Sequence, residues 1–170
     1  MLIRCRAITW RLSDSTVVAR KLGTSVRYLV ATPGYLNSRR APTEPAQLQD
    51  HDCVLMNAKN NETEWELVSG RRKARVRVAG PIATRDFNSA AAFTYRGHGI
   101  GLLPSTYCNA PLQAGSLIRL LPQWSSPEIP VQAVYTTRRF VPAKLQACLE
   151  ALRAWRSPLW ISDPTSAHNL

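Results

Sequence analysis

The sequence predicts an α/β protein whose sheet is mixed or parallel and carries helices on its faces. Two observations lead to this prediction. Residues 26–31 form an apolar, β-branched run that stops at a Thr-Pro-Gly sequence, which is typical of a buried strand closed by a turn. Residues 81–104 combine the end of a strand, a capped helix and a second apolar strand, and such a unit places its two strands parallel in one sheet.

The first half of the chain alternates short strands with polar connections. A short helix is expected from Tyr35, directly after the strand at 26–31. The polar stretch that follows predicts one helical turn around Leu48, and residues 53–56 then form a short buried strand. We expect a mobile surface loop over 57–64, because that stretch has almost no apolar residue to anchor it.

A β-hairpin is predicted from Trp65 onward, with its turn near Gly70. On its return strand, Ala74, Val76 and Val78 alternate with three basic residues, and successive side chains of a strand point to opposite faces. The basic residues are therefore expected to form a solvated face. The alternative is a dedicated surface for an anion or a partner; the three residues are Lys73, Arg75 and Arg77.

The second half contains the clearest helix signals. Asp86 is a good N-cap, an alanine-rich helix follows it, and Gly97 supplies the residue that ends the helix. The remaining predicted elements are a strand at 99–104, a helix near 105–110 and strands at 117–121 and 131–135. A last helix starts at Pro142, and its apolar face consists of Leu145, Cys148, Leu149, Leu152 and Trp155.

The net charge of +11 invites a nucleic-acid interpretation, but the arginines are dispersed except over 71–77. One segment, 16–29, has the small residues, the central Gly23 and the cap Ser25 of a helix-turn-helix. Its valines and the nearby Pro33 favour strands instead, so we expect a pair of strands around Gly23-Thr24. The alternative is a standalone basic DNA-binding protein that uses residues 16–29.

Several function classes lack their sequence signals. There is no nucleophile elbow, phosphate-binding loop or zinc-protease motif, so we expect no enzyme activity and no cofactor. The four cysteines and three histidines have no metal-ligand spacing, which predicts buried, reduced thiols and no metal site. The chain has neither an apolar run of ~18 residues nor a secretory signal, so we expect a cytoplasmic protein with no membrane partner.

Taken in order, the segments of this chain resemble the effector-binding domain of LysR-type transcriptional regulators. The matching segments cover most of the chain. They are LSDSTVVARKLGTSVRYLVATPGYL at 12–36, PAQLQDHDCVLM at 45–56, Trp65, the loop and helix after Thr84, GHGIGLLP at 97–104, AGSLIRLLPQW at 114–124 and PVQAVYTTRRFVPAKLQACLEALRAW at 130–155.

The resemblance implies a type II periplasmic-binding-protein-like fold, in which two lobes joined by two hinge strands enclose a small-molecule effector. It implies hinge strands at 28–31 and 131–134, and a homo-oligomer. The winged helix-turn-helix that would bind DNA has no counterpart here, which predicts a chain truncated at its N-terminus. The implied division is a partial first lobe with hinge entry (1–30), a complete second lobe (31–130), a hinge return strand with the last helix of the first lobe (131–160) and a flexible tail (161–170).

The expected effector site lies at the start of the helix after Asp86, where unsatisfied amides and the positive end of the helix dipole favour an anion such as a carboxylate. Ligands also collect at strand ends in α/β sheets. The candidate residues are Thr32, Thr84, Arg85, Asp86, Phe87 and Ile100. Five of the six have a plainer alternative: a strand end for Thr32, solvent for Arg85, a helix cap for Asp86 and ordinary core for Phe87 and Ile100. If Arg85 binds the effector, Arg85→Ala is expected to weaken binding by about 1.5–3 kcal/mol.

Overall fold

The computed structural model describes residues 17–136 and 143–154, which belong to two units. Unit 2 comprises Val26–Pro127, and unit 1 comprises the chain on either side of it. The chain therefore passes between the units after Ser25 and again after Pro127. No helix in the described part of the chain is both long and apolar enough to cross a membrane.

Unit 2 is built on a six-stranded sheet with the strand order β4-β5-β3-β6-β2-β7. Its strands are β2 (Arg27–Ala31), β3 (Asp52–Met56), β4 (Glu62–Ser69), β5 (Arg72–Thr84), β6 (Ile100–Pro104) and β7 (Ile118–Leu120). Its helices are α1 (Pro33–Asn37), the 3-10 helix η1 (Pro45–Asp50), α2 (Phe87–Tyr95) and α3 (Ser105–Gln113). The sheet is mixed, as the sequence predicts.

The predicted strand–helix–strand unit is β5, α2 and β6. Both strands pair in parallel with β3, which lies between them, and α2 makes the crossover. Strand β2 runs antiparallel to β6. As a result, the C-terminal ends of β3 and β5 and the N-terminal end of β2 share one edge of the sheet.

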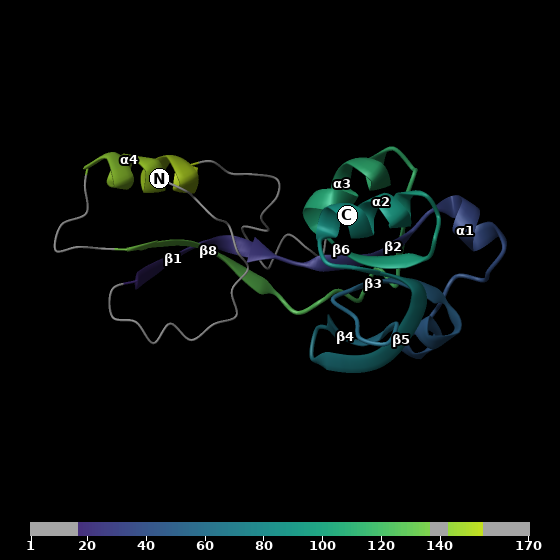
Figure 1. The fold of residues 1–170 in the computed structure, drawn as a ribbon. Helices are drawn as coiled ribbons and strands as arrows, with labels where there is room; N and C mark the ends of the chain where they lie inside the picture. The colour runs from purple at the N-terminus through teal and green to yellow at the C-terminus, as the bar shows by residue number, and fades with distance from the viewer. Residues whose placement is uncertain (1–16, 137–142, 155–170) are drawn as a thin grey trace. The chain divides into compact units, whose positions relative to one another are not determined.

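Alternation along the central strands divides the core into two clusters, one on each face. On β2, Leu29 and Ala31 belong to one cluster and Val30 to the other. Helices α2 and α3 cover the Val30 face through Ala90, Ala91 and Cys108. The opposite face is covered by the β4–β5 hairpin (Figure 1), and Tyr35 of α1 and Leu48 of η1 belong to the same cluster.

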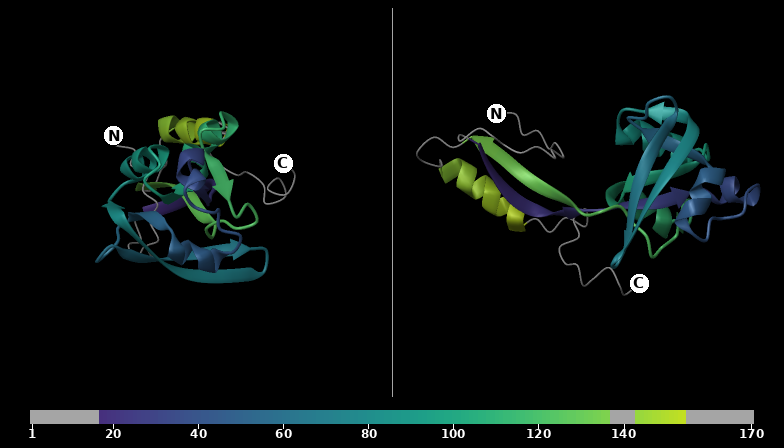
Figure 2. Two further views of the ribbon diagram at one scale, coloured as in Figure 1. Left: turned by 90° about the vertical axis from the view of Figure 1, so that its right-hand side faces the viewer. Right: turned by 90° about the horizontal axis from the view of Figure 1, so that it is seen from below.

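The predicted hairpin is present, and its basic face is solvated. Val76 and Val78 are buried, whereas Lys73, Arg75 and Arg77 are exposed. Strand β5 is 13 residues long and curved, so one end pairs with β4 and the other with β3 (Figure 2).

The prediction of a loop through residue 64 was wrong at its C-terminal end, because β4 begins at Glu62. The irregular connection covers only 57–61, where Asn57, Asn60 and Asn61 adopt positive φ. The polar residues at the start of β4 are accommodated because it is an edge strand with one exposed face. Glu62 forms an ion pair with Arg77 on the neighbouring strand.

In unit 1, β1 (Val17–Ser25) pairs antiparallel with β8 (Ile129–Thr136), and α4 (Ala143–Ala154) is the remaining described helix. The helix-turn-helix alternative for residues 16–29 is therefore wrong, because the described part of that segment consists of β1 and β2. The segment does consist of strands, as expected, but the break between them falls at Val26 and not at Gly23-Thr24, and the two strands lie in different sheets. Strand β1 continues through Gly23, and the glycine lies at a register shift in the β1–β8 ladder rather than in a turn.

The predicted hinge strands and the predicted last helix can be located in the structure. Residues 28–31, expected as a hinge strand, lie within the unit 2 sheet as part of β2, while residues 131–134 lie in β8 of unit 1. The apolar face of the last helix is present at Leu149, which is buried. Trp155, Cys5 and the predicted tail fall outside the described residues.

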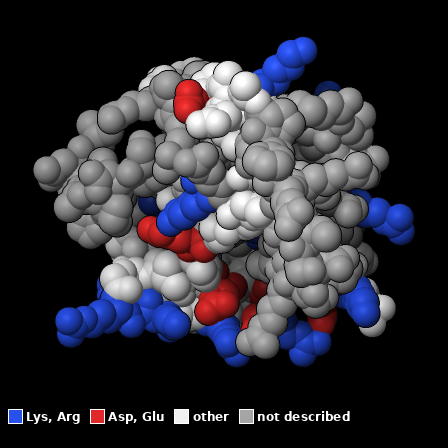
Figure 3. Space-filling model, turned by 90° about the vertical axis from the view of Figure 1, so that its left-hand side faces the viewer, with Lys and Arg blue, Asp and Glu red and all other residues white. Residues whose placement is uncertain are grey.

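Basic side chains on the face shown in Figure 3 project at several separate places with acidic side chains between them. On the β4–β5 hairpin, the acidic residues of one strand accompany the basic residues of the next. Glu64 Oε1 lies 4.0 Å from Arg75 Nε, in addition to the Glu62–Arg77 pair. The charges of this hairpin are thus partly matched within the hairpin itself.

Cys53 and Cys108 are buried free thiols, as predicted, and Cys148 is half-buried. Burial raises the pKa of Cys53 and of Cys108 to about 12, so at pH 8 only about one molecule in 10⁴ carries the thiolate that alkylating reagents attack.

We expect iodoacetamide to modify Cys148 at least about tenfold faster than either buried thiol. Peptide mass spectrometry over time measures this, with guanidinium-unfolded chain as the control. Equal rates in the folded chain would contradict it.

Candidate ligand-binding site

The strongest candidate site lies at the sheet edge where β3 and β5 end and β2 begins. Met56 pairs with Thr84 in the parallel ladder, so the two strands end side by side. Arg27, the first residue of β2, reaches the same edge because β2 is antiparallel to its neighbour β6. Helix α2 starts three residues after Thr84.

A cavity of about 210 Å³ opens at this edge, within unit 2. Its lining combines six apolar side chains with four polar or charged ones. The lining residues are Arg27, Val54, Met56, Asn57, Thr63, Glu64, Trp65, Phe87, Ala90 and Leu102.

Arg27 is the distinctive charged group of this cavity. Its guanidinium lies 5.1 Å from the centroid of the Phe87 ring, and it has no hydrogen-bond or ion-pair partner among the described residues. Partial burial lowers the pKa of Arg27 from its ordinary value through desolvation, yet an arginine stays charged at neutral pH. The cavity therefore contains a partly desolvated cation that forms no ion pair with a described residue. Glu64 also lines the cavity, and its carboxylate is directed to Arg75.

Local backbone structure fixes the opposite wall. Asn57 follows β3 with φ of 53°, a left-handed conformation that asparagine tolerates better than most residues. The backbone N–H of Asn57 donates to the Thr84 carbonyl oxygen at 2.8 Å, and the Thr84 hydroxyl donates to the Leu55 carbonyl oxygen at 3.1 Å. Thr84 is itself buried, so it holds the two strand ends together beside the cavity.

The sequence-predicted residues around Asp86 lie at this edge. Phe87 lines the cavity, and Arg85 is exposed with no partner among the described residues. Asp86 caps α2: its carboxylate accepts from the Ser89 amide and hydroxyl, each at 2.8 Å, and these hydrogen bonds hold the pKa of Asp86 below its usual value. The carboxylate of Asp86 thus already occupies part of the positive end of the helix, where the effector anion was expected.

The other two predicted residues lie at the opposite edge of the sheet. Thr32 follows the C-terminal end of β2 and caps α1, accepting a hydrogen bond from the Tyr35 amide at 3.2 Å. Ile100 begins β6 and is fully buried in the core. Because β2 is antiparallel to β6, these two residues are near each other but a strand length away from Thr84.

Sequence reasoning missed Arg27 and Trp65 as cavity residues. A signal for Arg27 was present, since it is the one charged residue within the apolar run VRYLVA at 26–31. A charge inside an otherwise buried strand needs a polar environment and therefore marks a site. Trp65 offered no such signal, because an alternating tryptophan on a strand is as typical of core as of a pocket.

The position of this cavity is that of a candidate ligand-binding site. Its cavity sits at the ends of parallel strands, where α/β sheets bind small molecules. Among the described residues, no group of three or more histidine, cysteine or acidic side chains is placed to hold a metal ion.

The chain belongs to the LysR substrate binding domain family, which it matches over residues 5–157. Among curated relatives, it is 31% identical over 140 residues to the HTH-type transcriptional activator TtdR of Escherichia coli, covering 81% of this chain and 44% of the relative. It is 29% identical over 140 residues to the regulator PtxR of Pseudomonas aeruginosa, covering 82% and 45% respectively. The chain thus spans less than half the length of these relatives.

Solved structures agree with this assignment. The regulatory domain of AphB from Vibrio vulnificus, treated with cumene hydroperoxide, superposes with a TM-score of 0.71 and 26% sequence identity, covering 84% of this chain and 70% of that chain. Such regulatory domains have a type II periplasmic-binding-protein-like fold, and the mixed sheet of unit 2 conforms to it. The predicted family and fold class are confirmed.

Proposed function

We propose that this chain senses a small carboxylate effector in the cavity beside Arg27. The observation that supports this most directly is the guanidinium of Arg27, which lines the cavity, stacks on Phe87 and forms no ion pair with a described residue. A carboxylate would supply that charge through charge-assisted hydrogen bonds. The walls formed by Val54, Met56 and Leu102 favour an effector with an apolar body.

The backbone of Arg27, whose side chain lines the cavity, is hydrogen-bonded to the last residues of unit 2. The Arg27 amide donates to Ser126 Oγ at 2.9 Å, and the Ser126 amide donates to the Arg27 carbonyl oxygen at 3.0 Å. These two bonds tie the strand that enters unit 2 to the segment that leaves it. An effector that binds one conformation of Arg27 more tightly than another would shift the population toward that conformation. The two connections between the units, after Ser25 and after Pro127, would then change together.

In the whole regulator, this shift would reposition DNA-binding domains that lie outside the present sequence. The relatives' names as HTH-type transcriptional regulators support that role, a cytoplasmic location and contact with DNA through the helix-turn-helix. The proposed assembly is a homo-oligomer, and the proposed chemistry is binding without catalysis.

Benzoate is a suitable probe for the cavity, because it joins a carboxylate to an apolar ring, and benzamide is its uncharged analogue. We expect benzoate to bind this chain by isothermal titration calorimetry and benzamide to bind at least about tenfold more weakly. Arg27→Ala should weaken benzoate binding by about 1.5–3 kcal/mol, the value of a hydrogen bond to a charged group.

Arg96→Ala is the matched control, since Arg96 is an exposed arginine beyond the last residue of α2 and does not line the cavity. Arg85→Ala, measured in the same titration, tests the earlier candidate. Equal binding of benzoate by the Arg27→Ala variant and the unsubstituted chain would remove Arg27 from the site. Binding by neither benzoate nor hexanoate would count against a carboxylate effector.

A further inference from the structure

A second and larger cavity lies elsewhere on unit 2, between the end of α1 and the start of β3. Its volume is about 510 Å³, and its lining comes entirely from residues 39–51. It shares no lining residue with the cavity at Arg27. The two cavities are at opposite edges of the sheet, because this one precedes β3 whereas the first lies where β3 ends.

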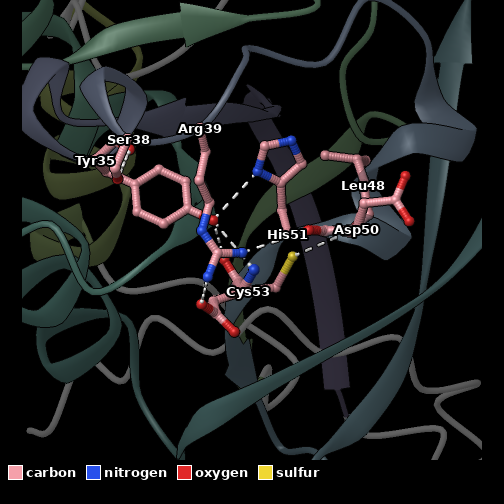
Figure 4. Close-up of polar contacts among 8 residues, drawn as sticks. Tyr35, Ser38, Arg39, Leu48, Asp50, His51 and Cys53 are labelled. Carbon is pink, nitrogen blue, oxygen red and sulfur yellow. Dashed lines mark hydrogen bonds and ion pairs between the residues drawn. The ribbon is translucent and has the colours of Figure 1, made fainter.

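Two of its lining side chains, Arg39 and His51, are held by contacts with residues that do not line the cavity. Arg39 Nη2 lies 2.8 Å from Asp52 Oδ2, and the guanidinium is 5.7 Å from the centroid of the Tyr35 ring. The buried His51 is held through Nδ1, which is 3.2 Å from the Tyr35 hydroxyl (Figure 4). Preorganisation of this kind reduces the entropy that a ligand-binding site loses when it is filled.

A third lining side chain, Gln47, is held by its oxygen. Gln47 Oε1 accepts from the amide of Thr43 at 2.7 Å and from its hydroxyl at 3.2 Å. The NH₂ group of Gln47 has no partner among the described residues. The carboxamide is therefore oriented by one end and keeps two donors at the other.

The charges of the cavity are of both signs. The Arg39 charge is matched by Asp52, which leaves the side chains of Arg40 and Asp50. Both are exposed, and neither side chain has an ion pair or hydrogen bond within the described part of the chain. A simple anion in this cavity would lie near Asp50, and a simple cation would lie near two arginines, so each would meet a like charge.

We propose that this cavity binds a zwitterion of the size of a free amino acid. The carboxylate of the ligand pairs with Arg40 and its ammonium group with Asp50. The Gln47 amide donors and His51 provide polar contacts for the rest of the ligand. The whole set of charges in the cavity is then matched, which neither a simple anion nor a simple cation achieves.

Isothermal titration calorimetry of the full chain tests this site with L-alanine, L-glutamine and L-leucine as probes. At least one free amino acid is expected to bind. For that amino acid, the N-acetyl derivative, which lacks the ammonium charge, and the amide derivative, which lacks the carboxylate, should each bind about tenfold more weakly. Arg40→Ala and Asp50→Asn should each cause a loss of about the same size.

Arg71→Ala is the matched control, because it removes an exposed arginine at the hairpin turn, far along the chain from this cavity. Circular dichroism checks that each variant keeps the unfolding midpoint of the unsubstituted chain. The proposal is overturned if no probe binds at about 10 mM. Equal binding of an N-acetyl or amide derivative, or unchanged binding in both cavity variants, also overturns it.

Discussion

Gly80→Ala is expected to destabilise the chain by at least about 3 kcal/mol, because a side chain at this position has no room. A Cβ on Gly80 would lie 1.9 Å from the Cys53 carbonyl oxygen and 2.8 Å from the Cys53 nitrogen. These are backbone atoms of a central strand, so they cannot move aside as the end of a flexible side chain can. Urea unfolding followed by circular dichroism measures the loss.

The close approach has a topological origin. The β3–β5 ladder shifts register between Asp52 and Val54, so the two residues Gly80 and Pro81 face the single residue Cys53. At this bulge β5 passes from its pairing with β4 to its pairing with β3. The glycine therefore permits the bend that brings the hairpin over the sheet.

Gly34→Ala is the matched control for Gly80→Ala. Gly34 lies in α1, has no atom within 4 Å of an added Cβ, and does not have a positive φ. Alanine there should leave stability unchanged or raise it by up to about 1 kcal/mol. The same midpoint of unfolding for Gly80→Ala and the unsubstituted chain would show that the β3–β5 contact is looser than this structure has it.

Leu67→Ala is expected to cost about 2–5 kcal/mol, the range found when a buried leucine is truncated and a cavity remains. Leu67 lies on β4, an edge strand, yet its side chain is 0% exposed and belongs to the larger core cluster. The expected loss therefore tests whether the curled hairpin is part of the core. The measurement is again urea unfolding, with the m-value reporting any change in the surface exposed.

Ile118→Ala provides the comparison, because Ile118 lies on the opposite edge strand, β7, and is 41% exposed. Its truncation should cost less than about 1 kcal/mol. If the Leu67 and Ile118 variants lost equal stability, the hairpin would contribute to the fold no more than an exposed edge does.

Local signals in the sequence predicted most of the elements. The N-cap Asp86, the helix after it and the alternating face of β5 were all readable, because a cap and a periodicity involve only residues close together in the chain. The start of β4 at Glu62 was not readable, since polar residues on an edge strand have the composition of a loop. Strand β1 was misjudged at Gly23 because a glycine permits a bulge as readily as a turn.

The sequence alone indicated the family and fold class through its ordered resemblance to a known family, and it predicted the elements of unit 2, apart from the start of β4, through patterns that repeat over two to four residues. Which residues share a cavity was decided only by the tertiary structure. Strand order and direction bring Arg27, Trp65 and Phe87 together from three separate segments, and the antiparallel direction of β2 takes Thr32 to the other edge. Such contacts depend on register between distant strands, and no local pattern encodes that register.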